Sequence, residues 1–182
     1  KNKIIPTYKK KSKVFFGGAR SGNVGGTLTK VKKLKDSFGE SLFNFNIVYL
    51  LSNTPYLFQF NLNLINQLKI PIVHNQNGFF YQSWYKGDFT KKNKQIIRQY
   101  NKANYIFFQS KFCSEISFKY LGSPGCSYDV LYNAVDTNFF KPNLNNYSSN
   151  KFSFLITGKF GIHLKDSLIL SIMGINECNK LG

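Results

Sequence analysis

The sequence predicts an α/β protein in which a Rossmann-like parallel sheet is flanked by helices and followed by a truncated second Rossmann-like domain. Strand-like runs alternate with helix-like runs along the chain, which is the pattern of parallel βαβ units. The strand-like runs are almost continuously apolar, as is typical of strands covered on both faces. With 182 residues, 42% of them hydrophobic, the chain can bury one full core and part of a second.

The predicted elements follow from apolar spacing and from residues that end helices or begin strands. Pro71 indicates the start of the third strand, and Gly122 indicates the end of the fourth helix. The predicted strands are 13–18, 45–51, 70–75, 104–110, 128–133 and, in the second domain, 151–159. The predicted helices are 27–38, 56–69, 91–103, 111–122 and 164–180. In the first helix the spacing places Leu28, Val31, Leu34 and Phe38 on one face, with the lysines mostly outside.

The domain boundary is expected where the apolar pattern stops. Residues 1–142 form the predicted N-terminal domain, 143–150 a polar linker, and 151–182 the beginning of the second domain. The strand before the boundary is predicted to be buried, and Phe139 and Phe140 are expected to anchor the chain that leaves it. Because the sequence ends directly after a helix-like segment, we expect it to be a fragment.

Lysine and arginine outnumber aspartate and glutamate by 25 to 8, which gives a formal charge of +17. Such a charge attracts polyanions, including nucleic acid, anionic lipid and phosphorylated ligands. The alternative is a solvated lysine surface, because the abundance of Lys, Asn, Ile and Phe together is typical of proteins from AT-rich genomes. Composition leaves both interpretations open.

Cysteine usage and hydropathy predict the compartment. Cys113, Cys126 and Cys178 are widely spaced and odd in number, so neither a disulfide framework nor a zinc site is predicted, and a reducing compartment is favoured. The start of the chain lacks an apolar signal core, and no run approaches the roughly 18 apolar residues that a membrane span requires. We therefore expect a cytoplasmic protein, either soluble or peripheral at the inner face of the membrane.

A glycine-rich loop joins the first predicted strand to the first helix and contains Gly17, Gly18, Gly22, Gly25 and Gly26. Such a loop lets backbone amides and a helix N-terminus approach an anionic or polyhydroxyl ligand. The spacing is not that of the dinucleotide fingerprint, and no acidic residue ends the second strand. The alternative is a tight turn between strand and helix that binds nothing.

A polar group follows the third predicted strand and consists of His74, Asn75, Gln76 and Asn77, with the aromatic residues Phe79, Phe80, Tyr81, Trp84 and Tyr85 after it. Amides and an imidazole can bond to hydroxyls, and aromatic faces can stack on sugar rings. A lone histidine is more often structural than catalytic, so both roles stay open for His74. The eight carboxylates show no obvious pairing for acid/base hydrolysis, and no GxSxG, P-loop or HExxH motif occurs.

Four segments carry a family resemblance, in the order IPIVHNQNGFFYQSWY, ANYIFFQSKFCSEISFKYLG, VLYNAVDTNFFKP and FSFLITGKF. Together they resemble the N-terminal half of a family-four glycosyltransferase, which has the GT-B fold of two Rossmann-like domains. The resemblance covers nearly the whole chain. Its most specific element is the Asn-x-Val-Asp segment that precedes Phe-x-Pro.

The resemblance implies retaining transfer of a sugar from a nucleotide-sugar donor to a glycan or lipid acceptor, without a metal or other cofactor, in glycan biosynthesis. It implies that His74 approaches the transferred sugar as the catalytic candidate. It implies donor-phosphate contacts from Gly25, Gly26, Lys159 and Lys165. It also implies an acceptor site or cleft lined by Arg20, Asn23, Asn75, Asn77 and Tyr81. Asn133 and Asp136 follow the last predicted strand of the first domain and are expected to face the mouth of that cleft, because open α/β sheets bind ligands at the carboxyl ends of their strands; the alternative is that they only cap a turn. The family usually has Arg where Lys159 stands, and its glutamate-rich donor motif is absent from these residues, so the fragment alone is expected to be inactive.

The alternative from a different class is a basic nucleic-acid-binding module without catalytic activity, in which lysines and aromatics form a stacking platform. The basic residues are spread through the predicted helices, and no nucleic-acid-binding motif occurs. We therefore favour the transferase and expect no nucleic-acid partner. We also expect the lysine-rich surface to make peripheral contact with an anionic membrane.

Overall fold

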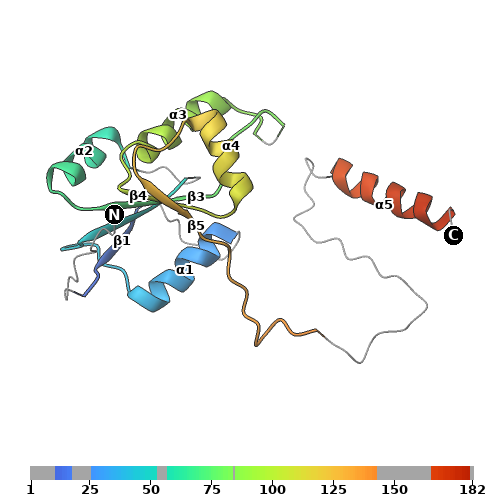
Figure 1. The fold of residues 1–182 in the computed structure, drawn as a ribbon, viewed down its shortest axis with the longest axis horizontal. Coiled ribbons are helices and arrows are strands. Elements are labelled where there is room, and N and C mark those ends of the chain that lie inside the picture. Colours follow the sequence, from blue (N-terminus) through green and yellow to red (C-terminus); the bar gives the residue numbers. More distant parts are fainter. Residues whose placement is uncertain (1–10, 18–25, 53–56, 84, 143–164, 181–182) are drawn as a thin grey trace, which may run out of the picture. The chain divides into compact units, whose positions relative to one another are not determined.

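Figure 1 shows the fold in a computed structural model of the chain, which describes residues 11–17, 26–52, 57–83, 85–142 and 165–180. The chain divides into two units, residues 1–134 and 135–182. The first unit contains a parallel sheet with helices, and the second contains the described helix α5 (Lys165–Lys180). The predicted linker at 143–150 and the predicted strand at 151–159 lie outside the described residues.

The first unit has one five-stranded sheet in which every neighbouring pair is parallel and the spatial order equals the chain order. Its strands are β1 (Val14–Gly17), β2 (Ile47–Leu51), β3 (Ile72–Gln76), β4 (Tyr105–Phe108) and β5 (Ser127–Val130). The helices between them are α1 (Gly26–Phe38), α2 (Gln59–Gln67), α3 (Phe89–Tyr100) and α4 (Lys111–Leu121). The predicted α/β class, a parallel sheet flanked by helices, is therefore confirmed.

The described helices cover both faces of the sheet, because the side chains of a strand point alternately to its two sides. In β2, Val48 and Leu50 join a larger core that contains residues of α2, α3 and α4. The next residue, Leu51, joins a smaller core with Val31 of α1. Helix α1 therefore lies on one face and α2, α3 and α4 on the other, as Figure 1 shows.

This arrangement gives the β1–α1–β2 connection the opposite hand to the three connections that follow it. When parallel strands follow chain order, connections of one hand place all their helices on one face. Of the described helices in this unit, α1 alone packs on its face, so its connection differs in hand. Helices α1 and α2, which follow the neighbouring strands β1 and β2 along the chain, therefore lie on opposite faces of the sheet.

Phe108 of β4 lies at the centre of the larger core. It is fully buried, and its ring contacts those of Tyr100, Phe118 and Tyr128 edge to face, at centroid distances of 6.4, 5.5 and 5.6 Å. Burying an aromatic side chain of this size contributes about 1.5–3 kcal/mol to stability. These contacts fix α3 and α4 against the sheet, and so determine where their ends lie.

The end of the sheet differs from the prediction of a buried strand that continues to residue 133. Strand β5 ends at Val130 and is largely exposed, since it is the last strand of the sheet. Leu131 and Tyr132, which follow it, are exposed as well. Phe139 and Phe140 belong to the second unit, where their side chains are 78% and 66% exposed and contact each other, and their anchoring of the chain stays a prediction. A short apolar run does not by itself distinguish a central strand from an edge strand.

The first helix is confirmed, but its two faces differ from the prediction. Val31 is buried and Leu28 and Leu34 are half-buried, as expected. Phe38 is exposed, because the smaller core includes Leu34 but does not reach the last turn of the helix. Lys30, predicted to lie outside, is half-buried.

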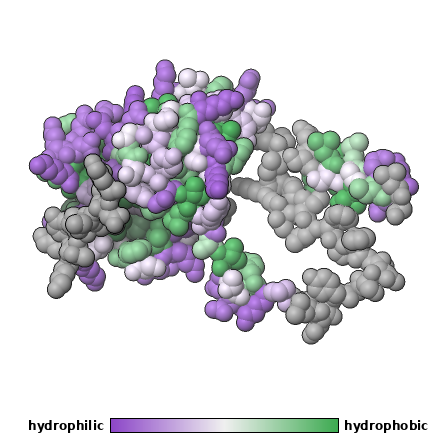
Figure 2. Space-filling model, viewed as in Figure 1, coloured by the Kyte–Doolittle hydropathy of each residue, from purple (hydrophilic) through white to green (hydrophobic). Residues whose placement is uncertain are grey.

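The surface carries both polar and apolar residues. Figure 2 shows hydrophilic residues over much of the sheet-bearing unit, and hydrophobic residues at the surface of α5. In α5 the exposed apolar residues are Ile169, Leu170, Ile172 and Met173. Of the helices in the described ranges, none has the length and apolar character that crossing a bilayer requires.

Candidate functional site

Polar side chains gather at the carboxyl ends of the central strands. Ser52 directly follows β2, Asn75 and Asn77 lie at the end of β3, and Gln109 directly follows β4. Parallel strands place their carboxyl ends at one edge of the sheet, so these residues come together although the chain separates them. Asn133, which follows β5, joins them through a hydrogen bond. We call these five residues the polar edge.

Hydrogen bonds connect the polar edge across the strands. The Ser52 hydroxyl accepts from the backbone N–H of Asn77 at 3.0 Å, and the Gln109 side chain donates to the Asn77 carbonyl at 2.6 Å. The side-chain amide of Asn133 donates to the side-chain oxygen of Gln109 at 3.2 Å. The backbone of Asn77 is therefore held from both neighbouring strands, which positions its side chain.

Two side-chain oxygens of the polar edge, Oδ1 of Asn75 and Oδ1 of Asn77, are buried and have no hydrogen-bond partner among the described residues. The side-chain NH2 groups of the same two residues do have acceptors: Asn75 donates to the Tyr49 hydroxyl, and Asn77 donates to the Asn75 carbonyl at 3.4 Å. Leaving a buried acceptor unpaired costs about 1–3 kcal/mol. Two such acceptors near the end of one strand are suited to a ligand that donates hydroxyl or amide hydrogens.

His74 lies on the opposite side of β3, inside the larger core. It is fully buried, its Nε2 bonds the Gln76 side-chain oxygen at 2.8 Å, and its ring meets that of Tyr100 edge to face at 6.1 Å. Burial lowers the pKa of His74 to about 4, outweighing the hydrogen bond to Gln76, which raises it. The imidazole is therefore neutral near pH 7. These contacts give His74 a structural role, and the catalytic role stays a prediction.

Two helices begin beside the polar edge, α1 at Gly26 and α4 at Lys111. The Ser110 hydroxyl caps α4 by accepting from the Cys113 N–H at 3.0 Å. Burial raises the pKa of the Cys113 thiol, while the nearby charge of Lys30 lowers it. Lys30 and Cys113 therefore lie within electrostatic range of each other, and the Cys113 thiol itself donates to the Gln76 carbonyl, at the end of β3, at 3.3 Å.

Lys30 is a cation in a partly desolvated position. Burial lowers its pKa, because removing an ammonium group from water disfavours its charged form. The ion pairs found in the described part of the chain join Lys35 to Glu40 and Lys180 to Glu177, so neither involves Lys30. A half-buried lysine near a helix N-terminus favours an anion at that place.

The structure brings together three of the residues predicted to line the acceptor site or cleft, Asn75, Asn77 and Asn133. Tyr81 lies in the loop after β3, where its side chain is 51% exposed and its ring packs against Phe79 at 6.1 Å.

Asp136 belongs to the second unit, where it caps a turn. Its carboxylate accepts from the N–H groups of Asn138 at 3.0 Å and Phe139 at 3.3 Å. Among the predicted phosphate-binding residues, Gly26 begins α1 and Lys165 begins α5. The other predicted residues, Arg20, Asn23, Gly25 and Lys159, lie outside the described residues.

Sequence reasoning missed Ser52, Gln109 and Lys30. Ser52 and Gln109 each follow a strand directly. The rule that ligands bind at the carboxyl ends of parallel strands therefore points to them as it does to the residues after the third strand. Lys30 has no such signal, because a single lysine is not distinctive among 25 basic residues.

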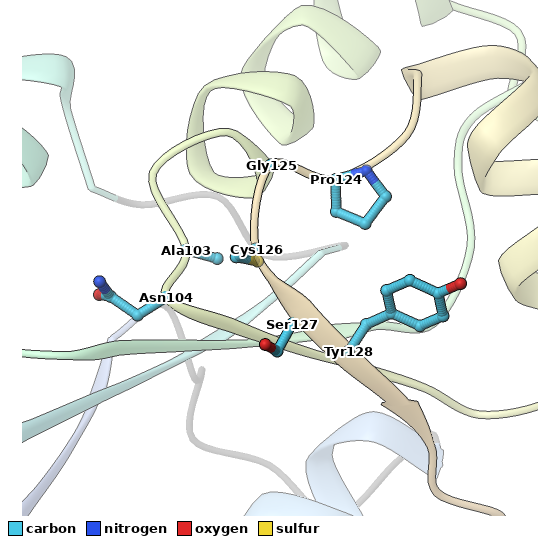
Figure 3. Close-up of a pocket in the computed structure, with 7 residues that line it drawn as sticks. All are labelled: Ala103, Asn104, Pro124, Gly125, Cys126, Ser127 and Tyr128. Atoms are coloured by element: carbon cyan, nitrogen blue, oxygen red, sulfur yellow. The ribbon is translucent and has the colours of Figure 1, made fainter. Parts of the chain in front are cut away.

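A shallow hollow lies at the opposite edge of the sheet, and Figure 3 shows its lining residues: Ala103, Asn104, Pro124, Gly125, Cys126, Ser127 and Tyr128. These residues precede or begin β4 and β5, so the hollow is at the amino ends of the strands. Asn104 has a structural task there, because its side-chain oxygen accepts from the Ile72 N–H at 2.8 Å. Burial raises the pKa of Cys126, which keeps its thiol protonated and unreactive. The polar edge is therefore a stronger candidate for a ligand-binding site than this hollow.

Within the described ranges, no three His, Cys, Asp or Glu side chains lie close enough together to hold a metal ion. The expectation that the protein works without a metal or other cofactor stays a prediction.

Comparison of the chain with family models, curated proteins and solved structures found no match. The resemblance to family-four glycosyltransferases therefore stays a prediction that rests on the four sequence segments.

Proposed function

We propose that the chain belongs to a retaining GT-B glycosyltransferase, which transfers a sugar from a nucleotide-sugar donor to a glycan or lipid acceptor. The polar edge would bind the acceptor or the transferred sugar. The observation that carries this proposal is the pair of buried, unpaired oxygens on Asn75 and Asn77, because sugar hydroxyls are hydrogen donors. The fold supports it less, since α/β sheets of this kind host many functions.

The chemistry of the edge suits a sugar attached to phosphate. Asn75 and Asn77 would accept from hydroxyls, while Lys30 and the N-termini of α1 and α4 would attract the phosphate charge. In a partly desolvated site such attraction is stronger than in water. None of the five polar-edge residues is acidic, so the edge would act by positioning the substrate and stabilising charge rather than by acid/base chemistry.

We propose that the chain is divided into an acceptor side, a linker and a donor side, as the family resemblance implies. Residues 1–142 would form the acceptor side, 143–150 the linker, and 151–182 the beginning of the donor side. The remaining donor-phosphate contacts would come from Gly25, Gly26, Lys159 and Lys165. A cytoplasmic location suits this activity, because nucleotide sugars would be its substrates.

Binding measurements with a panel of sugars and nucleotide sugars test the proposal. We expect Asn77→Ala to weaken binding about tenfold, since losing one hydrogen bond of about 1.4 kcal/mol has that effect. Lys30→Gln should weaken the binding of phosphorylated ligands but not of free sugars. Asn61→Ala, on the exposed side of α2, is the matched control and should bind as the wild type does.

Three outcomes would contradict the proposal. Sugar binding that Asn77→Ala leaves unchanged would remove the polar edge as the site. Tighter binding of single-stranded nucleic acid than of any sugar would favour the basic nucleic-acid-binding module instead. Absence of binding to every sugar and nucleotide sugar of the panel would contradict a role in sugar transfer.

A further inference from the structure

Helix α2 is apolar on two sides. Leu62 and Ile65 are buried in the larger core, whereas Phe60, Leu64 and Leu68 are 74%, 43% and 61% exposed. The exposed three are spaced four residues apart, so they form one line along the outer side of the helix. We call them the α2 stripe. Large apolar side chains gathered on an outer helix face indicate a surface that another surface covers.

The neighbouring helix, α3, is strongly basic. Helices α2 and α3 cover the same face of the sheet, and their buried residues belong to the same core. Neither helix contains an acidic residue, although Asp88 caps the start of α3. The basic residues of α3 are Lys91, Lys92, Lys94 and Arg98. Of these, Lys91, Lys94 and Arg98 are exposed, on a helix that covers the same face of the sheet as α2.

Charge distinguishes between the partners that could cover this surface. A second copy of the chain would bring a net charge of +17 toward an equal charge, and the two copies would repel each other. A bilayer with anionic lipid matches both features, because its interface accepts apolar side chains while its headgroups attract lysine and arginine. We propose that α2 and α3 form a peripheral membrane-binding surface, in which the α2 stripe enters the interface and α3 contacts anionic headgroups.

This surface is separate from the polar edge, and the inference does not rest on the proposed sugar transfer. None of the residues of the α2 stripe or of basic α3 belongs to the polar edge. A test with lipid vesicles alone, without any sugar or nucleotide, therefore decides it independently of the proposed function.

The test is co-sedimentation of the chain with vesicles of phosphatidylcholine, alone or mixed with phosphatidylserine, at low salt. The stripe variant is Phe60→Ser/Leu64→Ser/Leu68→Ser, and its matched control is Phe38→Ser/Leu42→Ser/Phe43→Ser, which replaces three exposed apolar residues elsewhere. The charge variant is Lys91→Gln/Lys94→Gln/Arg98→Gln, and its matched control is Lys11→Gln/Lys32→Gln/Lys33→Gln, which removes the same charge from exposed positions elsewhere.

We expect binding to the phosphatidylserine vesicles and little binding to phosphatidylcholine alone. The charge variant should lose about 100-fold in partitioning, because each basic residue near an anionic surface contributes about fivefold. The stripe variant should lose at least about tenfold, since three apolar side chains leave the interface. Each control should keep most of the wild-type binding, and circular dichroism should show that all four variants are folded.

Several results would overturn the inference. Controls that lose as much binding as their test variants would assign the attraction to the overall charge rather than to α2 and α3. Equal binding to neutral vesicles, or no binding at low salt, would exclude an anionic membrane as the partner. A wild-type dimer in light scattering that the stripe variant converts to a monomer would assign the α2 stripe to self-association.

Discussion

His74 should make the folded protein sensitive to acid. Burial lowers its pKa from 6.5 to about 4, so the folded protein binds this proton only near pH 4, while the unfolded chain binds it near pH 6.5. Between these values the unfolded state holds more protons than the folded state. The stability that the neutral imidazole provides is therefore complete above pH 6.5 and is lost as the pH falls toward 4.

The two pKa values set the size of the effect. Their difference corresponds to about 3 kcal/mol of unfolding free energy once the pH is well below 4. Between about pH 7.5 and about pH 5 the loss is about 2 kcal/mol, from the proton uptake of the two states. A domain of this size has a total stability of about 5–15 kcal/mol, so the loss is readily measured.

Urea unfolding of the wild type and of His74→Leu, at about pH 7.5 and about pH 5, tests this prediction. The variant loses the bond to Gln76 and should be less stable at the higher pH, but it has no proton to take up. The stability difference between the two proteins should therefore change by about 2 kcal/mol in favour of the variant at the lower pH. A difference that is independent of pH would refute the buried neutral imidazole.

Three further substitutions and one control test the packing and a helix cap, and urea unfolding measures all four. Phe108→Ala should cost about 3–5 kcal/mol of unfolding free energy. The exposed Phe112→Ala should change it by less than about 0.5 kcal/mol, and equal effects would contradict the assigned core. Ser110→Ala removes the N-cap of α4 and should cost about 1 kcal/mol, so an unchanged stability would contradict the cap. Gly17→Ala would place a methyl group 2.9 Å from a Leu50 side-chain carbon and should cost about 1–3 kcal/mol, whereas a stabilised variant would contradict that close packing.

The elements of the first unit were predictable because local patterns specify them. The end of α4 is an example, since Gly122 has a φ of +88°, a conformation that glycine adopts without strain. The face on which α1 packs was not predictable, because it depends on which strand pairs with β1, a long-range choice that no local pattern records. The exposure of β5 was missed for the same reason. A strand lies at the edge of a sheet when no further strand pairs with its outer side, and this too is a long-range property that no local pattern records.

The candidate site was predictable only in part. The rule that ligands bind at the carboxyl ends of parallel strands directed attention to Asn75 and Asn77, which the structure places in the polar edge. It could not separate them from His74, because alternate residues of one strand face opposite sides and the sequence does not say which side holds the larger core. The hydrogen bonds from Ser52 and Gln109 that hold Asn77 arise from strand register, which only the three-dimensional structure provides.

Whether the polar edge binds a sugar ligand is tested most directly by NMR. Sugars and nucleotide sugars are added to the isotope-labelled chain, and the backbone amide signals that change their chemical shift are mapped onto the structure. Because weak sugar binding corresponds to dissociation constants near 1 mM, the ligands are added at millimolar concentrations. We expect the shifts to cluster at Ser52, Asn77 and Gln109, with none around Cys126 in the hollow at the opposite edge. Shifts confined to that hollow, or no shifts with any ligand of the panel, would contradict the assignment of the polar edge as the binding site.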